Sequence, residues 1–357
     1  MNLTLHLTEN CNMNCAYCVR EKKAVRMSQE VVDAACELIF TRGKSAGLCF
    51  FGGEPMLERP LIEHALERTQ ALSKEKGIPV QYKMTTNGTL LDEDFLAIAR
   101  RAKIGIGISF EGLAQDTCRH FKDGTGTFAC VEEKAKLLLR YMPDSYAMMT
   151  IAPQAVSQYA ESVRYLRELG FYRITATIAY GNKVHWDEAS LEQLRQQMLE
   201  IAAYYEEQFL QKKPIFFSAF DAKIRDVIRG FNPSERCHLG FRQMPVAPDG
   251  KLYACTQFIG DEDYCLGDVF SGVDAERQRK LASRAATPES CKECALRTRC
   301  TNSCGCMNRL ETGNENTVSP VQCAYERMLI EISDEIGNKL FAADERAFRK
   351  RYASNLS

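Results

Sequence analysis

The sequence predicts an α/β protein: a partial (β/α)6 TIM-like barrel, followed by an irregular cysteine-rich domain and a C-terminal helix. Three observations support this prediction. Residues 3–210 alternate short apolar or β-branched runs with amphipathic stretches, which is typical of parallel βα units. Polar motifs follow the first four of these runs, and a βα barrel gathers its functional loops at such strand ends. Eight of the sixteen cysteines crowd into two short stretches, 11–18 and 291–306.

Six strand–helix pairs make up the predicted barrel. Ser28 is a suitable N-cap for the first helix, and Gly170 is a suitable C-terminal stop for the fifth. Strands are expected where the runs are apolar or β-branched, at 3–7, 47–51, 80–85, 104–110, 146–151 and 173–178. Helices are expected where apolar residues recur at helical spacing, at 29–40, 60–76, 92–101, 128–140, 158–169 and 188–210. An open doubly wound sheet is the alternative, but it would concentrate the motifs at one switch point.

The pattern changes after Gly230. Helical periodicity fades, and Gly, Pro, Asn and Cys interrupt short segments as far as Asn308. Apolar residues alone would not order such a stretch, so we expect bound metal to contribute much of its folding. A helix is expected again at 321–341, before a charged tail. The predicted parts are a barrel at 1–212, a bridging segment at 213–235, a cysteine-rich domain at 236–325, and a C-terminal helix and tail at 326–357.

The composition excludes several classes of protein. Lys and Arg number 46 against 47 Asp and Glu, a net charge of −1, so a strongly basic nucleic-acid binder is excluded. No apolar stretch approaches the roughly 18 residues that a membrane span needs, and the first residues lack the features of a signal peptide. We therefore expect a cytoplasmic protein with reduced thiols, because disulfides are rare in that compartment. Clustered thiols there are typical of metal ligands.

Cys11, Cys15 and Cys18 form the first cysteine cluster, directly after the first predicted strand. Three thiolates so close can hold one face of a [4Fe–4S] cube and leave its fourth iron without a protein ligand. A structural zinc site usually needs four ligands, and no nearby His or Cys supplies the fourth. The open iron would be a place for a small chelating ligand.

A Gly-Gly-Glu-Pro motif follows the second predicted strand, at Gly52, Gly53, Glu54 and Pro55. With the CxxxCxxC spacing of the first cluster, this motif makes the chain resemble the radical S-adenosylmethionine (SAM) superfamily. In that superfamily the amino and carboxylate groups of SAM chelate the open iron, and the GGEP motif holds the amino group. Glu54 fits that role by its charge. On its own the tetrapeptide would be a tight turn.

Four further residues resemble the SAM contacts of the superfamily. Asn87 ends the third strand, Ser109 ends the fourth, and Arg119 follows shortly after, in segments like those that contact the ribose and the methionine carboxylate. Tyr17 precedes the third cysteine, where the superfamily usually has an aromatic side chain beside the adenine. Glu111 departs from the commoner Ser-x-Asp-Gly pattern and is not included. The alternatives are a turn for Asn87, a polar strand end for Ser109 and a surface charge for Arg119.

The C-terminal cysteines resemble the SPASM domain of radical SAM enzymes that modify peptides and proteins, which holds auxiliary [4Fe–4S] clusters. By this resemblance the outer auxiliary cluster would be ligated by Cys291, Cys294, Cys300 and Cys323. The inner cluster would be ligated by Cys237, Cys255 and Cys304. Its fourth position has three candidate occupants: Cys265, Cys306, or an open iron that awaits substrate. A zinc ribbon made from Cys291, Cys294, Cys300 and Cys304 is the alternative, but it leaves the other motif cysteines unused.

The resemblance implies an oxidoreductase with SAM and three [4Fe–4S] clusters, in which a 5′-deoxyadenosyl radical takes hydrogen from an unactivated C–H bond. The stretches 252–260 and 266–269 resemble thioether-forming maturases of ribosomally made peptides. We therefore expect a precursor peptide as substrate, a cysteine thioether as product, and a flavodoxin- or ferredoxin-type electron donor. Many such maturases have an N-terminal peptide-recognition domain. Cys11 lies too close to Met1 for one, so recognition is expected from a separate protein or to be unnecessary.

The sequence is also compatible with other functions. Carbon–carbon cyclophane formation, epimerisation and anaerobic sulfatase maturation are alternative reactions of similar enzymes. In the sulfatase-maturing family an Asp that acts as the base follows the cysteine that matches Cys255, whereas this chain has Thr256 there. A non-enzymatic iron–sulfur electron carrier would explain the cysteines but would leave the GGEP motif and the barrel loops without a purpose.

Overall fold

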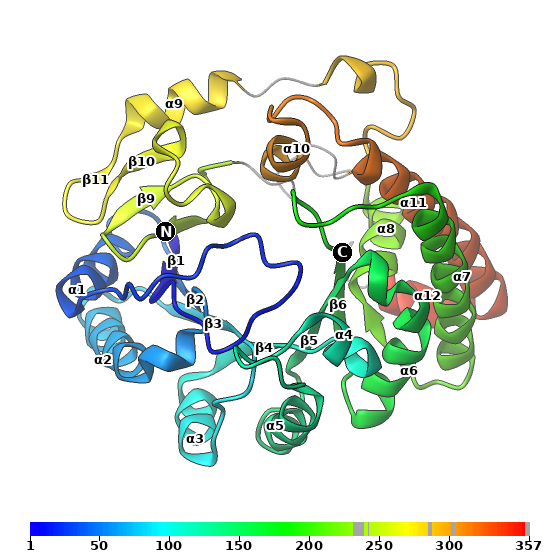
Figure 1. The fold of residues 1–357 in the computed structure, drawn as a ribbon, viewed down its shortest axis with the longest axis horizontal. Coiled ribbons are helices and arrows are strands. Elements are labelled where there is room, and N and C mark those ends of the chain that lie inside the picture. The colour runs from blue at the N-terminus through cyan, green and yellow to red at the C-terminus, as the bar shows by residue number, and fades with distance from the viewer. Residues whose placement is uncertain (231–238, 242, 285–287, 301–303, 354–357) are drawn as a thin grey trace. The chain divides into compact units, whose positions relative to one another are not determined.

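The computed structural model describes residues 1–230, 239–241, 243–284, 288–300 and 304–353. The described chain forms two compact units (Figure 1). The first unit comprises Met1–Ser109, Arg119–Ser145 and His238–Ala286, and the second comprises Phe110–Cys118, Tyr146–Cys237 and Thr287–Ser357. Each unit is built from segments that lie far apart in the sequence.

The first unit contains a mixed sheet with the strand order β11-β10-β9-β8-β1-β2-β3-β4. Its parallel part is formed by β1 (Asn2–His6), β2 (Ala46–Phe51), β3 (Val80–Thr86), β4 (Ile104–Ser109) and β8 (Met244–Val246). The antiparallel part is formed by β9 (Lys251–Tyr253), β10 (Cys265–Asp268) and β11 (Gly272–Val273). Leu3 of β1 is in register with Met244 of β8, so the cysteine-rich region continues the sheet that β1 begins.

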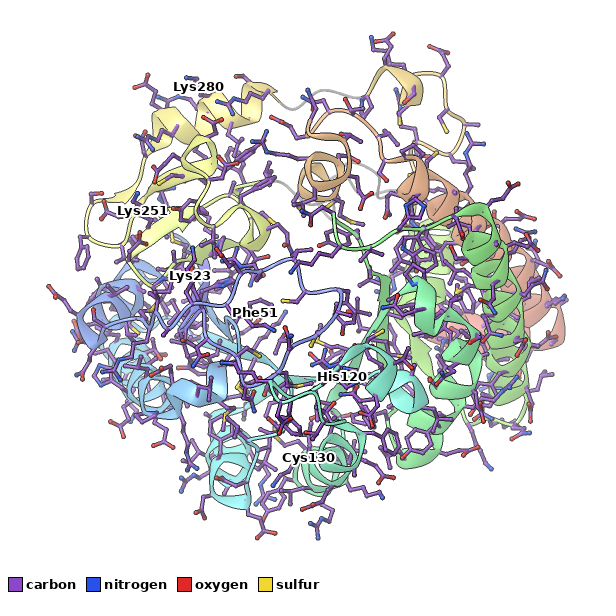
Figure 2. The ribbon with its side chains drawn as sticks, in the orientation of Figure 1. Lys23, Phe51, His120, Cys130, Lys251 and Lys280 are labelled. Carbon is purple, nitrogen blue, oxygen red and sulfur yellow. The ribbon has the colours of Figure 1, made fainter. Side chains whose placement is uncertain are left out.

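The helices of the first unit follow the strands as the sequence predicts. They are α1 (Gln29–Leu38), α2 (Arg59–Lys76), α3 (Glu93–Ala102), α5 (Phe128–Tyr141) and α9 (Ala275–Arg284), with short turns η1 (Pro55–Glu58), η5 (Thr256–Phe258) and η6 (Glu262–Tyr264). The predicted cap of the first helix is confirmed, because the Ser28 side chain accepts a hydrogen bond from the Val31 N–H at 3.3 Å. Lys251 and Lys280 lie at the periphery of this unit, whereas Phe51 lies at the inner end of β2 (Figure 2).

The second unit contains the parallel strands β5 (Tyr146–Ile151), β6 (Arg173–Ile178) and β7 (Phe216–Phe217). Its main helices are α6 (Tyr159–Leu169), α7 (Glu188–Leu210), α8 (Ser218–Arg229), α11 (Pro320–Ala343) and α12 (Glu345–Tyr352). Shorter elements are η2 (Gly112–Ala114), α4 (Gln115–Cys118), η3 (Pro153–Gln158), η7 (Glu289–Cys291) and α10 (Gly305–Thr312). Gly170 follows the end of α6, as predicted, with φ +121°.

The observed elements agree closely with the predicted ones in the barrel and less well beyond it. All six predicted strands and all six predicted helices are present, with boundaries shifted by at most two residues. The structure adds α8 within the predicted bridging segment and α12 within the predicted tail. No helix among the described residues is long and apolar enough to span a membrane.

Candidate functional site

A cavity of about 970 Å³, counting its open mouth, lies at the carboxyl ends of β1–β4 in the first unit. His6, Phe51, Thr86 and Ser109 are at or next to those strand ends and line it. The three cysteines of the first cluster line it as well, together with Tyr17, Gly52, Gly53, Asn87 and Arg119. The structure therefore brings nine of the eleven predicted N-terminal site residues to the wall of one cavity, and Glu54 and Pro55 are the two that do not line it.

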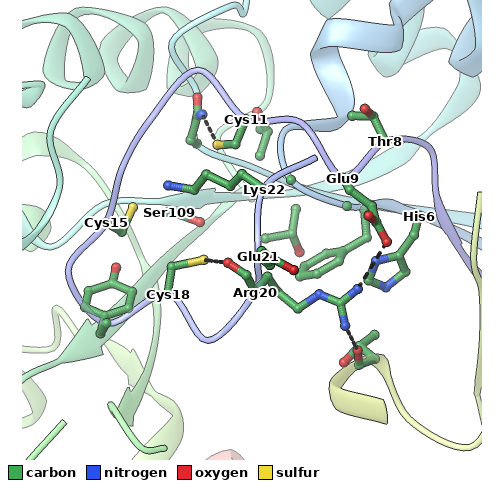
Figure 3. A pocket seen from close by; sticks show the side chains of 18 of the residues that line it. His6, Thr8, Glu9, Cys11, Cys15, Cys18, Arg20, Glu21, Lys22 and Ser109 are labelled. Atoms are coloured by element: carbon green, nitrogen blue, oxygen red, sulfur yellow. Dashed lines mark hydrogen bonds and ion pairs between the residues drawn. The ribbon is translucent and has the colours of Figure 1, made fainter. Parts of the chain in front are cut away.

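The three cysteines lie on the loop that follows β1 (Figure 3). Cys11 is buried, whereas Cys15 and Cys18 are half-buried. The Met13 N–H points at the Cys11 sulfur at 3.4 Å, and the Cys18 N–H donates to the Cys15 carbonyl at 3.1 Å, which closes a turn between the last two cysteines. Burial is the main cause that raises the pKa of the Cys11 thiol.

Asn87 attaches the end of β3 to this loop. Its side-chain N–H group donates to the Asn12 side-chain oxygen at 2.8 Å and approaches the Cys11 sulfur at 3.9 Å. Asn12 in turn donates to the Thr89 hydroxyl at 2.8 Å, and that hydroxyl donates back to the Asn87 oxygen at 2.8 Å. The side chains of Asn12, Asn87 and Thr89 thus hold Cys11 next to the end of β3.

The two glycines of the GGEP motif allow its backbone to run against the backbone of the cysteine loop. Gly53 N–H donates to the Thr8 carbonyl at 2.8 Å, and Glu54 N–H donates to the Asn10 carbonyl at 2.9 Å. A Cβ atom on Gly52 would lie 2.4 Å from the Thr8 oxygen, and one on Gly53 would lie 2.1 Å from the Asn10 oxygen. Only glycine permits this approach at either position.

Glu54 is fully buried, and its carboxylate accepts three hydrogen bonds. The donors are the Met56 N–H at 3.0 Å, the Thr86 hydroxyl at 2.7 Å and the Asn87 N–H at 2.7 Å. Burial raises the pKa of this carboxyl, and the three hydrogen bonds oppose that rise. Glu54 therefore joins the GGEP turn to the end of β3. Pro55 is buried beside it at the start of η1.

Arg119 and Tyr17, which the sequence assigned separately to SAM contacts, contact each other. The Arg119 guanidinium donates to the Tyr17 hydroxyl at 2.8 Å, and a second nitrogen lies 4.0 Å from the Met13 sulfur. Arg119 is 6% exposed, so it is not the surface charge that was the alternative interpretation. The pair connects the cysteine loop to the segment that follows β4.

Arg20 connects the cysteine loop to the segment after Cys255, within the same unit. Its guanidinium donates to the Thr256 carbonyl at 3.0 Å and lies 3.9 Å from the Glu9 carboxylate (Figure 3). Burial lowers the pKa of Arg20, although Glu9, Cys18 and Cys255 act in the opposite direction. Thr256 and Gln257 line the same cavity as the first three cysteines. The sequence did not single out Arg20, and its place two residues after Cys18 was the one available signal.

The second cysteine cluster lies in the second unit. Arg327 on α11 hydrogen-bonds the Cys323 thiol and lies close enough to Cys294 and Cys300 for all three sulfurs to raise the pKa of its guanidinium. Three of the four cysteines assigned to the outer set therefore surround one arginine. The fourth, Cys291, closes η7 three residues before Cys294, whose N–H donates to the Cys291 carbonyl at 3.2 Å.

The inner set is divided between the two units. Cys237 lies outside the described residues, Cys255 belongs to the first unit and Cys304 to the second. Cys306 is buried, and its sulfur lies 3.2 Å from that of Cys304. Cys265 instead packs into an apolar cluster with Ala247 and Tyr253, and its thiol donates to the Gly267 carbonyl.

The first cluster offers three thiols on one loop, which is the donor set that one face of an iron–sulfur cube takes. Within the described ranges, no three His, Cys, Asp or Glu side chains are placed to share one metal ion. In a cube, each thiolate binds a different iron, so the sulfurs lie farther apart than zinc ligands do. Arg20, Lys22 and Arg119 line the cavity together with Glu9 and Glu21, and the charge of Lys22 opposes the rise in the pKa of the Cys11 thiol.

Two curated proteins are similar in sequence to most of this chain. The chain is 22% identical over 323 residues to the cysteine-type anaerobic sulfatase-maturating enzyme of Clostridium perfringens (strain 13 / Type A), covering 83% of this chain and 86% of that protein. It is also 22% identical over 315 residues to the serine-type enzyme of Klebsiella aerogenes, covering 82% and 76% of the two chains.

Two solved structures have a similar fold. A structure of native anSMEcpe with bound AdoMet matches with a TM-score of 0.83 at 19% identity, covering 95% of this chain and 99% of that chain. SuiB of Streptococcus suis bound to its precursor peptide SuiA matches with a TM-score of 0.61 at 16% identity, covering 90% and 75%. At these identities the likeness establishes the fold. The predicted α/β class, with a TIM-like core and a cysteine-rich C-terminal region, is thereby confirmed.

The sequence pattern that describes the radical SAM superfamily matches residues 5–194, which include the end of β1, the cysteine loop, the GGEP motif and the strand ends that line the cavity. The match spans more than half of the 357-residue chain. The protein therefore belongs to the radical SAM superfamily.

Proposed function

We propose that this protein is a radical SAM oxidoreductase that modifies a cysteine-bearing peptide, and that the modification is a thioether cross-link. The observation that supports SAM chemistry most strongly is the cavity at the ends of β1–β4, where the three cysteines of the loop meet the GGEP turn. SAM bound beside a reduced [4Fe–4S] cluster would supply a radical that removes a hydrogen atom from a C–H bond.

The residues around the cavity fit these cofactors. Cys11, Cys15 and Cys18 would hold the cluster and leave one iron open for SAM. Gly52 and Gly53 of the GGEP turn line the cavity, where their carbonyl groups would offer acceptors for an ammonium group, and Asn87 and Ser109 would offer polar contacts for a ribose. The Glu54 carboxylate, which is fully buried directly after Gly53, would be a further acceptor. The Arg119–Tyr17 pair presents a cation and an aromatic ring on the same wall.

Two auxiliary clusters complete the proposal. Cys291, Cys294, Cys300 and Cys323 would hold the outer one, and Cys237, Cys255 and Cys304 would hold the inner one. Cys306 is the better candidate for a fourth inner ligand than Cys265, because it adjoins Cys304 whereas Cys265 faces an apolar cluster. Anaerobic reconstitution should yield about twelve irons per chain, and an iron content near four would contradict the three-cluster proposal.

Thr256 supports the thioether in preference to sulfatase maturation. It lies on the cavity wall and directly follows Cys255, at the position where the sulfatase-maturing family has an Asp that acts as a base. A threonine hydroxyl is not a base near neutral pH, whereas a thioether enzyme could ionise its thiol at an iron instead. Forming the thioether breaks one S–H and one C–H bond and makes one C–S bond. The 5′-deoxyadenosyl radical would take the hydrogen atom from carbon, an auxiliary cluster would accept the second electron, and the thiol proton would be released.

A second candidate is sulfatase maturation, which the comparisons favour. The similar curated proteins include both cysteine-type and serine-type sulfatase-maturating enzymes, each matched over most of its length. The partners in either case would be a peptide or protein substrate and a reductant of flavodoxin or ferredoxin type. A separate peptide-recognition protein belongs to the thioether proposal alone.

Mass spectrometry distinguishes the two candidates. The reconstituted enzyme is incubated with SAM, dithionite and either single-cysteine peptides encoded near its gene or a peptide from a sulfatase active site. A thioether enzyme removes two hydrogen atoms from the first kind of peptide, retains the sulfur and blocks its alkylation by iodoacetamide. A change in the sulfatase peptide alone would favour the second candidate, and a thiol that stays alkylatable in every product would contradict the thioether.

A further inference from the structure

His6 is a buried polar residue on the cavity wall that the proposed SAM and cluster contacts do not use. It is the last residue of β1, it is 2% exposed, and it lines the cavity (Figure 3). Its Nε2 atom is buried and has no hydrogen-bond partner within the part of the chain that the structure describes. Buried polar atoms of this kind are rare in folded proteins, so a partner from a bound molecule is expected.

The surroundings of His6 fix both its charge and its orientation. Burial, and to a smaller extent the nearby charge of Arg20, lowers the pKa of the ring to about 3, so the imidazole is neutral at physiological pH. The Phe51 ring meets it edge-on with 5.1 Å between ring centroids. Arg20 is itself held by the Thr256 carbonyl and the Glu9 carboxylate. The ring is therefore a rigid, uncharged hydrogen-bonding group.

These neighbours restrict what the ring can bind. A cationic group would be repelled by Arg20, and a neutral ring gives no ionic attraction of its own to a charged group. An amide or a thiol can pair with neutral imidazole without either penalty. Phe51 adds an apolar surface beside the same ring. Such a combination of one polar group and an aromatic wall is typical of sites that orient a bound molecule.

We infer that His6 is a substrate-binding residue whose Nε2 hydrogen-bonds an uncharged group of the peptide, a backbone amide or the cysteine thiol. This inference rests on the proposed function, because it takes a peptide as the molecule that enters the cavity. It assigns the end of β1 to substrate recognition, whereas the cysteine loop and the GGEP turn are assigned to the cofactors.

The test uses the full reconstituted chain with three substitutions. His6→Leu removes the nitrogen at similar volume, His6→Gln restores a polar atom near the Nε2 position, and His185→Gln changes an exposed histidine as a control. The probe is the peptide that the wild-type enzyme selects from a pooled library of synthetic single-cysteine peptides. SAM affinity, peptide affinity without reductant, and 5′-deoxyadenosine formation without peptide are measured for each variant.

We expect His6→Leu to weaken peptide binding roughly 3- to 10-fold, as the loss of one neutral hydrogen bond would. SAM affinity and peptide-free SAM cleavage should stay within about twofold of wild type, and His6→Gln should recover part of the peptide affinity. Unchanged peptide affinity in His6→Leu would overturn the inference, as would a loss confined to SAM affinity. A wild-type enzyme that cleaves SAM but selects no peptide would contradict the proposed function itself, and this inference with it.

Discussion

Glu54 illustrates at the scale of one residue how a motif can serve the fold and a ligand together. The sequence resemblance assigns it to the SAM amino group, and the structure places three protein donors on the same carboxylate. A carboxylate has about four lone-pair directions, so three protein donors do not use all of them, although Glu54 is fully buried and is not among the residues that line the cavity. The SAM contact stays a prediction, whereas the contact with the end of β3 is visible in the structure.

Replacing Glu54 with Gln tests both roles. The amide nitrogen would face a backbone N–H, of either Met56 or Asn87, so we expect the free energy of unfolding to fall by about 1–3 kcal/mol. SAM affinity should fall as well if the carboxylate holds the ammonium, with the cluster spectrum intact. Glu58→Gln in the same turn is the control and should change stability by less than about 0.5 kcal/mol. Unchanged SAM affinity would leave Glu54 with the structural role alone.

His6 gives a pH dependence whose sign follows from its lowered pKa. The folded ring titrates at about 3, whereas an unfolded histidine titrates near its ordinary value of 6.5. Between these values the unfolded chain binds one proton more, so the stability due to His6 is present above pH 6.5 and is lost as the pH falls towards 3. From pH 7 to pH 5 the loss should be about 2 kcal/mol.

Urea unfolding of wild type and His6→Leu at pH 7 and pH 5 measures this contribution of His6 to the free energy of unfolding. The wild type should lose more stability on acidification than the variant does. Equal losses in the two proteins would show that His6 is already protonated in the folded chain or is not buried.

At the scale of elements, the barrel was predictable because strands and helices there carry local signals. β5, β6 and α7 have the predicted boundaries, and Ser28 and Gly170 cap their helices as expected. The helix α8 was missed because it begins after Phe217, which provides no side-chain cap. This helix also lies in the predicted bridging segment 213–235, where no alternation of strands and helices indicates it.

The contact between α8 and α11 positions the outer cysteines through a buried ion pair. Lys223 of α8 lies 2.7 Å from Glu326 of α11, and both side chains are less than 5% exposed. Lys223 also donates to the Arg299 carbonyl at 2.9 Å, directly before Cys300. Glu326 follows Cys323 on α11 by three residues, so the pair holds Cys300 and Cys323 in the same region.

Lys223→Met should therefore destabilise the second unit by about 3–5 kcal/mol, because it leaves the Glu326 carboxylate buried without its cation. Iron content should fall by up to one cluster if the outer set loses its geometry. The double variant with Glu326→Gln should recover much of the stability, and Arg195→Ala, in an exposed ion pair, should cost less than about 1 kcal/mol. Thermal unfolding and iron analysis would check this, and full stability in Lys223→Met would show that the ion pair is not needed.

At the scale of the whole molecule, the sequence predicted the candidate site where the site residues form motifs of fixed spacing. The CxxxCxxC loop and the GGEP motif are local patterns, and both line or support one cavity. Relations between distant segments had no local signal. The pairing of β8 with β1, the Arg20–Thr256 hydrogen bond and the place of His6 beside Arg20 depend on how the chain folds back on itself. Such contacts between distant segments could not be inferred from the sequence alone.

The function proposed for the whole molecule depends on SAM being bound and cleaved at the cavity beneath the cysteine loop. Dithionite-dependent formation of 5′-deoxyadenosine from SAM measures this most directly. The assay compares the reconstituted wild type with a triple variant that carries Cys11→Ala, Cys15→Ala and Cys18→Ala. Cys36→Ala, at a buried cysteine outside the loop, is the control. We predict product from the wild type and from Cys36→Ala, and none from the triple variant, which should keep its auxiliary iron. Product from the triple variant, or none from an iron-replete wild type, would contradict the account.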